Sequence, residues 1–323
     1  MKDTAVLVLL FNRPHETEKL FEYLAKLKPE KLYVNQDGPR KNSLKDIELC
    51  EKVKKIALNP SWNCKVFSNL SKNNNGCRNS VSSGLDWFFE KEQFGIILED
   101  DCMPSISFFK FSKEMLNKYK DNKKIAVISG SNFQKDNKII GMGDYYYSKY
   151  AHCWGWSSWR RAWKYYDKNL SFWPKWKNSI EWKTFHQNKL EQKYWTSIFD
   201  RVYDNKIDSW AYIWQASVWY NNAMTITPNK NLILNIGFNK NATHTNIQDK
   251  NISNNPISSL PDDLKSPELI KIDMEADLMV FKNHFKGKFN FYPWKILLYI
   301  KYFFNDPYGF SIRLFKVFKK FKI

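Results

Sequence analysis

Apolar runs and amphipathic stretches alternate through the first part of the chain. Short apolar runs have the length and composition of buried β-strands at residues 5–11, 31–36, 64–69, 94–98 and 124–129. Stretches with apolar side chains at helical spacing separate them at residues 15–27, 44–58, 77–90 and 105–120. Strands that alternate with helices form βαβ units. The pattern therefore predicts an α/β fold with a mainly parallel central sheet flanked by helices.

Polar sequence follows three of these predicted strands, in "FNRP", "NQDGPR" and "LEDDCMP". Ligands bind beyond the carboxyl ends of parallel strands, so we expect these segments to share one crevice. The third segment places Glu99, Asp100 and Asp101 side by side, and adjacent carboxylates repel one another and are costly to desolvate. A divalent cation such as Mn²⁺ or Mg²⁺ would relieve that repulsion by taking carboxylate oxygens as ligands. The alternative is an acidic loop in which Asp101 caps the next helix.

Composition narrows the class of protein. The 323 residues carry a net charge of +18, and 17% of them are aromatic, which excludes a disordered chain. The positive charge predicts an anionic partner, namely nucleic acid, a nucleotide-bearing substrate or an anionic membrane; coding bias toward lysine is the alternative. Five cysteines without a CxxC pair indicate neither a disulfide framework nor a zinc site, and favour a reducing cytoplasm. The sequence lacks the glycine-rich motifs of P-loop kinases and dinucleotide oxidoreductases.

Five motifs, taken in order, resemble those of GT-A-fold glycosyltransferases. The likeness is to the N-acetylglucosaminyltransferase that initiates complex N-glycans, and to bacterial glycosyltransferases of surface-polysaccharide gene clusters. It spans roughly residues 4 to 245 and rests on "FNRP", "YVNQDG", "NNNGCRNSVSSGLDWFF", "LEDDCMPSISFFKF" and "AHCWGWSSWRRAW". A set in this order is more specific than any one of its motifs.

The resemblance implies a role for each matching residue. It implies nucleotide contacts from Arg13, Asp37, Arg78, Glu99 and Asp100. It implies a metal ligand at Asp101, and acceptor contacts at Trp154, Gly155, Trp156 and His244. Simpler interpretations remain open: a turn at Asp37, a helix start at Arg13, core packing for the tryptophans and a loop histidine at His244.

The catalytic base departs from the family pattern. The family places an acid beside a tryptophan downstream of the Gly-Trp segment, and here that region reads "DNKIDSWAYIWQ". Asp208 precedes Trp210, but Ala211 follows it where an acid is expected. Asp208 is therefore the candidate base, with Asp204 as a weaker substitute.

The resemblance implies a metal-dependent, inverting glycosyltransferase. The donor would be a UDP-sugar, with UDP-N-acetylglucosamine the first candidate. The acceptor would be a saccharide in synthesis of a bacterial lipooligosaccharide, O-antigen or capsule. We expect a nucleotide-sugar-binding half at residues 1–130 and an acceptor-binding, catalytic half at residues 131–245, then linker and loops at 246–289 and a basic tail at 290–323.

Two other classes of function stay open. A chain that kept the fold but lost its base would be a non-catalytic sugar-binding or scaffold protein, as Ala211 suggests. Basic charge interleaved with aromatic residues also suits a nucleic-acid-binding protein, although nucleic acid is not our predicted partner.

The tail predicts membrane association. Phe310, Leu314, Phe318 and Phe321 fall on one helical face, with Arg313, Lys316, Lys319 and Lys320 largely on the other. Such a helix lies in the interface of an anionic membrane, which predicts peripheral attachment to the inner face of the cytoplasmic membrane, beside a lipid-linked acceptor. A helix packed on the core is the alternative.

Overall fold

A computed structural model describes residues 4–134, 140–141, 143–237 and 256–287, with a few single positions between 291 and 304. The strands are β1 Ala5–Leu10, β2 Lys31–Gln36, β3 Lys65–Leu70, β4 Phe94–Glu99, β5 Cys102–Pro104, β6 Ile125–Ser129, β7 Tyr145–Ser148, β8 Trp156–Trp159, β9 Met224–Pro228 and β10 Ile233–Asn235. The helices are α1 Pro14–Leu27, α2 Leu44–Leu58, α3 Gly76–Lys91, α4 Ile106–Lys118, α5 Arg160–Trp163, α6 Trp173–Trp176, α7 Ile180–Phe185, α8 Lys189–Tyr203, α9 Trp210–Tyr220 and α11 Met274–Asn283.

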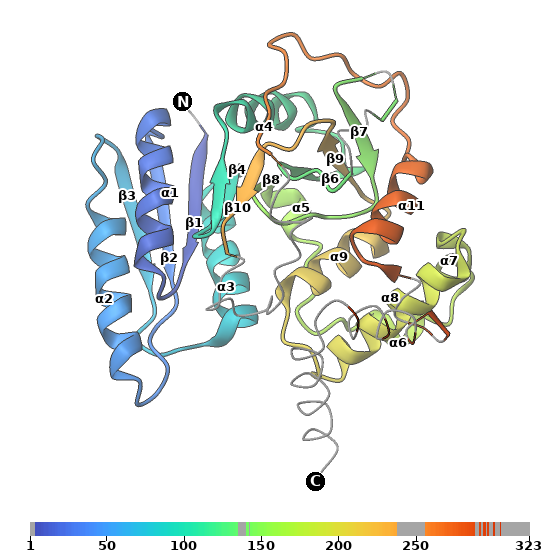
Figure 1. The fold of residues 1–323 in the computed structure, drawn as a ribbon, viewed down its shortest axis with the longest axis horizontal. Helices are drawn as coiled ribbons and strands as arrows, with labels where there is room; N and C mark the ends of the chain where they lie inside the picture. The colour runs from blue at the N-terminus through green and yellow to red at the C-terminus, as the bar shows by residue number, and fades with distance from the viewer. Residues whose placement is uncertain are drawn as a thin grey trace.

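The central sheet has eight strands in the order β3-β2-β1-β4-β8-β6-β9-β7 (Figure 1). β1 pairs in parallel with β2 on one side and with β4 on the other, and β3 continues the parallel part beyond β2. Apolar residues fill β1 and β4 and are buried there, as expected for strands covered on both faces. The strands and helices predicted for residues 5–129 are confirmed, and with them the α/β class.

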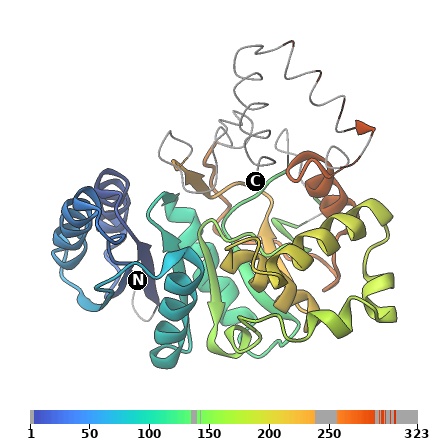
Figure 2. The ribbon, with the colours of Figure 1, turned by 90° about the horizontal axis from the view of Figure 1, so that it is seen from below.

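The connections in this half create a crevice between β1 and β4. The chain passes from β1 to β2 and β3 in one direction and then returns to β4 beside β1. Because such crossovers are right-handed, α1 and α2 lie side by side on one face and α3 lies on the other (Figures 1 and 2). The segments that follow β1 and β4 therefore diverge, and the carboxyl ends of these strands form a topological switch point, where ligands bind in open α/β sheets.

The second half adds antiparallel strands, so the sheet is mixed but stays mostly parallel. β8 lies between β4 and β6 and is antiparallel to both, and β7 is antiparallel to β9. β8 is only four residues long, "WSSW", and all four are buried. Its sequence therefore lacks the alternation of apolar and polar residues that marks a half-exposed strand.

Aromatic residues form a second core outside the sheet. Trp173, Trp182, Trp195 and Trp219 are buried among α6, α7, α8 and α9. Val280 and Phe281 of α11 join this core, so a helix lies within the region 246–289 that was expected to be linker and loops. No helix in the described ranges has the length and apolar character needed to cross a membrane. The predicted amphipathic tail lies almost entirely outside the described residues.

Candidate functional site

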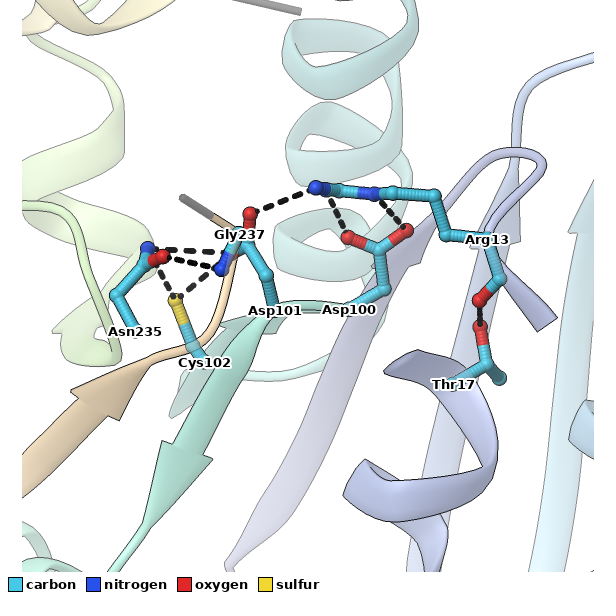
Figure 3. Close-up of polar contacts among 7 residues, drawn as sticks. All are labelled: Arg13, Thr17, Asp100, Asp101, Cys102, Asn235 and Gly237. Atoms are coloured by element: carbon cyan, nitrogen blue, oxygen red, sulfur yellow. Dashed lines mark hydrogen bonds and ion pairs between the residues drawn. The ribbon is translucent and has the colours of Figure 1, made fainter. Parts of the chain in front are cut away.

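An arginine and two aspartates meet at the switch point. Arg13 follows β1, and Asp100 and Asp101 follow β4 (Figure 3). The Arg13 guanidinium donates to Asp100 through Nε at 3.0 Å and also through Nη2, and to Asp101 Oδ2 through Nη1 at 2.9 Å. One guanidinium thus joins the ends of two neighbouring parallel strands through residues 87 and 88 positions apart.

The backbone at Arg13 explains why its side chain points this way. Arg13 is the N-cap residue of α1, and Pro14 occupies the first helical position, where the missing N–H costs nothing. The Arg13 carbonyl accepts hydrogen bonds from the backbone N–H of Thr17 at 3.0 Å and from its hydroxyl at 2.8 Å. Thr17 is buried. Arg13 therefore begins α1 and also pairs with Asp100 and Asp101, which together with Glu99 form the acid cluster.

Negative charge remains in excess around this arginine. Burial and the charges of Asp101 and Asp100 together raise the pKa of Glu99 to about 8, against the effect of Arg13. Burial also raises the pKa of Asp100 to about 7, although its ion pair with Arg13 opposes the rise. No described residue donates a hydrogen bond to the Glu99 carboxylate. A single guanidinium therefore does not compensate three carboxylates, and the cluster has the charge to accept a further cation.

The end of β10 covers Asp101, which the sequence pattern did not reveal. Asn235 Nδ2 donates to Asp101 Oδ1 at 3.3 Å, with the Cys102 thiol 3.5 Å from the same oxygen. The backbone of Gly237 passes so close that a Cβ placed there would lie 2.1 Å from Asp101 Oδ2 (Figure 3). A side chain at Gly237 would therefore displace the Asp101 carboxylate. Because β10 lies more than 130 residues from Asp101 in sequence, no local signal announces this contact.

Asp37, the second predicted nucleotide contact, organises the loop before α3. Its Oδ1 accepts the backbone N–H groups of Gly38 and Asn75, both at 2.9 Å, and its Oδ2 accepts the Asn74 side-chain amide at 2.9 Å. Burial raises the pKa of the Asp37 carboxyl, while these backbone hydrogen bonds oppose the rise. Asp37 therefore stabilises the turn that leads into α3, and any base contact would use the remaining lone pairs of its oxygens.

A second arginine–aspartate pair holds the loop after β2. Buried Asp46 accepts hydrogen bonds from Arg40, including Nη2 at 2.9 Å, and from Asn12 Nδ2 at 2.7 Å. The Arg40 hydrogen bonds hold the pKa of Asp46 well below its usual range, although burial opposes the shift. Asp46 therefore joins the segments that follow β1 and β2, and it was not among the predicted site residues.

The amino end of α3 brings four predicted residues together. Burial and the charges of Glu99, Asp208 and Asp37 together raise the pKa of the Cys77 thiol to about 12, with Arg13 opposing them. All four charged groups are thus close enough to act on one sulfur atom in the first turn of α3. Asp37 and Glu99, at the ends of β2 and β4, therefore lie near Asp208 from the second half of the chain.

Asp208 reaches α3 from the segment between α8 and α9. It is exposed, and its Oδ2 would lie 3.5 Å from a Cβ placed on Gly76, the first residue of α3. Asp204, the substitute candidate, ends α8 and pairs with Lys206 at 2.7 Å. Arg78 donates to Asn205 Oδ1 at 2.9 Å and to a backbone carbonyl of the second half, so its guanidinium holds this segment against α3 rather than joining the acid cluster.

Two of the predicted acceptor residues belong to the core, which corrects the expectation. Trp156 is fully buried, packed against Trp210 and Trp214 with ring centroids 5.8 and 6.0 Å apart, so no face is left for a sugar. Gly155 has a positive φ of 61°, and a Cβ there would lie 2.4 Å from Ile233 Cδ1. Its close neighbour is therefore β10 and not a ligand.

Of the other two predicted acceptor residues, Trp154 and His244, the structure describes only Trp154. Trp154 is half-buried, its ring 5.0 Å from that of Phe133 in an edge-on arrangement, and it stays a candidate. His244 lies outside the described residues.

A separate cavity of about 540 Å³ lies between α6, α7 and α8. Its lining includes Lys177, Lys183, Lys193 and Arg201 and, of the candidate site residues, only the substitute base Asp204. The candidate site at the switch point is thus defined by converging side chains and not by this cavity.

Comparisons with known proteins do not add a function. No family model matches the sequence, and no curated protein matches it. Among solved structures, the chain is similar to 4-diphosphocytidyl-2C-methyl-D-erythritol synthase from Anaerococcus prevotii, at 10% identity with a TM-score of 0.32. The similarity covers 68% of this chain and 96% of that chain. At this level it carries no statement about substrate or activity.

Proposed function

We propose that this protein is a glycosyltransferase that uses a nucleoside diphosphate sugar, with a UDP-sugar as the first candidate donor. The observation that carries the proposal is the pairing of Arg13 with Asp100 and Asp101 at the carboxyl ends of β1 and β4, with Asp37 at the end of the neighbouring strand β2. This is where open α/β sheets bind nucleotides. The acids and the arginine lie there because three separate strands end there.

The position of Asp208 favours an enzyme that transfers the sugar over a protein that only binds it. It comes from the second half of the chain and lies exposed beside the first turn of α3, within electrostatic range of the same thiol as the acids. An exposed carboxylate can accept the proton of an acceptor hydroxyl as that oxygen attacks the anomeric carbon. Asp204 is less suited because it is paired with Lys206.

The acid cluster suits a hard divalent cation in the kind and charge of its donors. Glu99, Asp100 and Asp101 supply carboxylate oxygens, and burial, with a smaller contribution from the neighbouring acids, raises the pKa values of Glu99 and Asp100. Within the described part of the chain, no three His, Cys, Asp or Glu side chains are arranged as a metal-binding cluster. Asp101 would therefore hold Mn²⁺ or Mg²⁺ together with ligands from outside the protein. A bound cation supplies charge neutralisation for a departing diphosphate.

The biological setting follows from the family resemblance. We propose that the acceptor is a saccharide of a bacterial surface glycan, and that the basic tail brings the enzyme to the cytoplasmic face of an anionic membrane. The membrane attachment is tested by co-sedimentation with anionic and neutral vesicles, which compares the full chain with a version that ends near Asn290.

A thermal-shift screen of UDP, GDP and CDP with and without Mn²⁺ tests the donor class. A ligand that binds only the folded state stabilises it, by about 2.7 kcal/mol at a hundred times its Kd. We expect UDP with Mn²⁺ to raise the melting temperature most, and UDP-N-acetylglucosamine to be hydrolysed or transferred slowly. If no nucleotide raises the melting temperature, the proposal is wrong. Nucleotide binding without hydrolysis or transfer would indicate a non-catalytic sugar-binding protein.

A further inference from the structure

Arg13 occupies the place among the acids that a metal ion would need. Each carboxylate oxygen of Asp100 and Asp101 already has a donor. Arg13 donates to both oxygens of Asp100 and to Oδ2 of Asp101, while Asn235 and the Cys102 thiol donate to Oδ1 of Asp101. A cation bound directly to Asp101 would take a remaining lone pair of its oxygens and would lie beside these donors.

Of the three donors to the Asp101 carboxylate, which are Arg13, Asn235 and the Cys102 thiol, Arg13 is the one a cation would displace because it alone is charged. Cations repel, so a guanidinium 2.9 Å from the Asp101 carboxylate opposes the arrival of a divalent ion. Asn235 is neutral and belongs to β10, whose backbone is held by antiparallel pairing with β5. The Arg13 side chain is held to the acids by hydrogen bonds, its backbone is fixed at the start of α1, and it is one-fifth exposed. Arg13 can therefore leave the acids by side-chain rotation without breaking a strand.

We propose that Arg13 is an exchangeable counter-cation that links metal binding to diphosphate binding. In the free chain Arg13 neutralises Asp100 and Asp101. When a divalent cation takes Asp101, the released guanidinium pairs with a phosphate of the nucleotide, which an arginine fork recognises through two hydrogen bonds. The second step rests on the function proposed above. The exchange makes metal and nucleotide favour each other's binding, by the same factor in both directions.

Mn²⁺ binding to the protein without any nucleotide tests the first step. Free Mn²⁺ is measured by electron paramagnetic resonance during titration of the wild-type chain, Arg13→Gln and Arg13→Lys. We expect Arg13→Gln to bind Mn²⁺ about tenfold more tightly than the wild-type chain, because the competing hydrogen bonds to carboxylate are gone. Arg13→Lys keeps the charge but loses the fork, so it should be intermediate. Arg13→Lys also tests the proposal if Arg13→Gln does not fold.

Lys52→Gln is the matched control for lost positive charge. Lys52 is exposed on α2 and pairs with Glu48 at 2.6 Å, away from the acids. Its Mn²⁺ affinity should equal that of the wild-type chain. Unchanged or weaker Mn²⁺ binding in both Arg13 variants would overturn the exchange.

UDP binding at saturating Mn²⁺, measured by calorimetry, separates the two steps. If Arg13 passes to the diphosphate, Arg13→Gln should bind UDP about tenfold more weakly than the wild-type chain even though it binds Mn²⁺ more tightly. Equal UDP affinity would overturn the second step. If the wild-type chain binds no UDP at all, the proposed function fails, whereas tighter Mn²⁺ binding in the variant still supports competition for the acids.

Discussion

Asp208 lies against Gly76, although the two residues belong to different halves of the chain. The Asp208 carboxylate would be 3.5 Å from a Cβ at Gly76, where α3 begins with a positive φ of 78°. The loop at this helix start is held by Asp37, which follows β2, and the segment before α9 is held to α3 by Arg78 through Asn205. Asp208 is thus placed beside the acids of the first half by contacts from both halves.

Replacing Asp208 should affect transfer and not donor binding. Asp208→Asn removes a base that acts on the acceptor, so kcat should fall by about 10²- to 10⁴-fold while the Kd for UDP with Mn²⁺ stays unchanged. Asp204→Asn is the matched control, since Asp204 lies four residues away and pairs with Lys206. Steady-state kinetics and calorimetry on both variants measure the two effects. If Asp204→Asn loses activity and Asp208→Asn retains it, the roles are reversed.

Replacing Asp101 should remove the metal dependence of nucleotide binding. Asp101→Asn keeps the shape of the side chain but loses a charged oxygen ligand, so the affinity for Mn²⁺ should fall by about ten- to a hundredfold. UDP should then bind equally with and without Mn²⁺, as calorimetry would show. Asp262→Asn is the control, because Asp262 is an exposed acid paired with Lys110. An unchanged Mn²⁺ requirement in Asp101→Asn would remove Asp101 from the metal site.

The stability of the chain should depend on pH through Asp277. Burial raises the pKa of Asp277 to about 7, although hydrogen bonds from the Lys149 backbone and Ser148 and the charge of Lys149 oppose the rise, while Glu191 adds to it. An unfolded aspartate ionises near pH 3.9, so between about pH 4 and pH 7 the folded chain holds a proton that the unfolded chain has lost. Folding stability attributable to Asp277 is therefore lost as the pH rises through this window, by at most about 1.4 kcal/mol per pH unit.

Asp277→Asn should isolate this effect. An asparagine can still accept from the Lys149 N–H but has no charge to desolvate, so the variant should gain stability relative to the wild-type chain as the pH rises from about 5 to about 8. Urea unfolding of both proteins across that range measures the difference. Parallel stability curves for the two proteins would mean that Asp277 does not titrate in the window.

A side chain at Gly155 should destabilise the fold through β10. In Gly155→Ala, the new Cβ would meet Ile233 Cδ1 at 2.4 Å in a backbone with a φ of 61°, so the cost should be about 1–3 kcal/mol. Ile233→Ala removes that contact, and in its background Gly155→Ala should cost less, leaving mainly the strain of the positive φ. Unfolding of the two single variants and the double variant gives the interaction energy. Additive effects would show that Ile233 is not what requires a glycine.

Much of the first half follows from the sequence alone because its signals are local. The apolar run of β4 and the helical spacing of α1, α2 and α3 each lie within one short segment, so periodicity predicts them without knowledge of neighbours. The polar endings "FNRP", "NQDGPR" and "LEDDCMP" likewise mark the ends of strands that a parallel sheet must gather. From these features the sequence by itself determined the α/β class and the candidate nucleotide edge.

The tertiary structure alone decided which side chains meet there. Arg13 pairs with acids 87 and 88 residues away, and Gly237, which follows β10, covers Asp101 from a distant part of the chain. Trp154 and Trp156 look equivalent in "CWGW", yet one is half-buried and the other is core, because β8 begins at the second and runs between β4 and β6. Pairing between distant strands depends on the register and packing of the whole sheet, and that information is not held in any one segment.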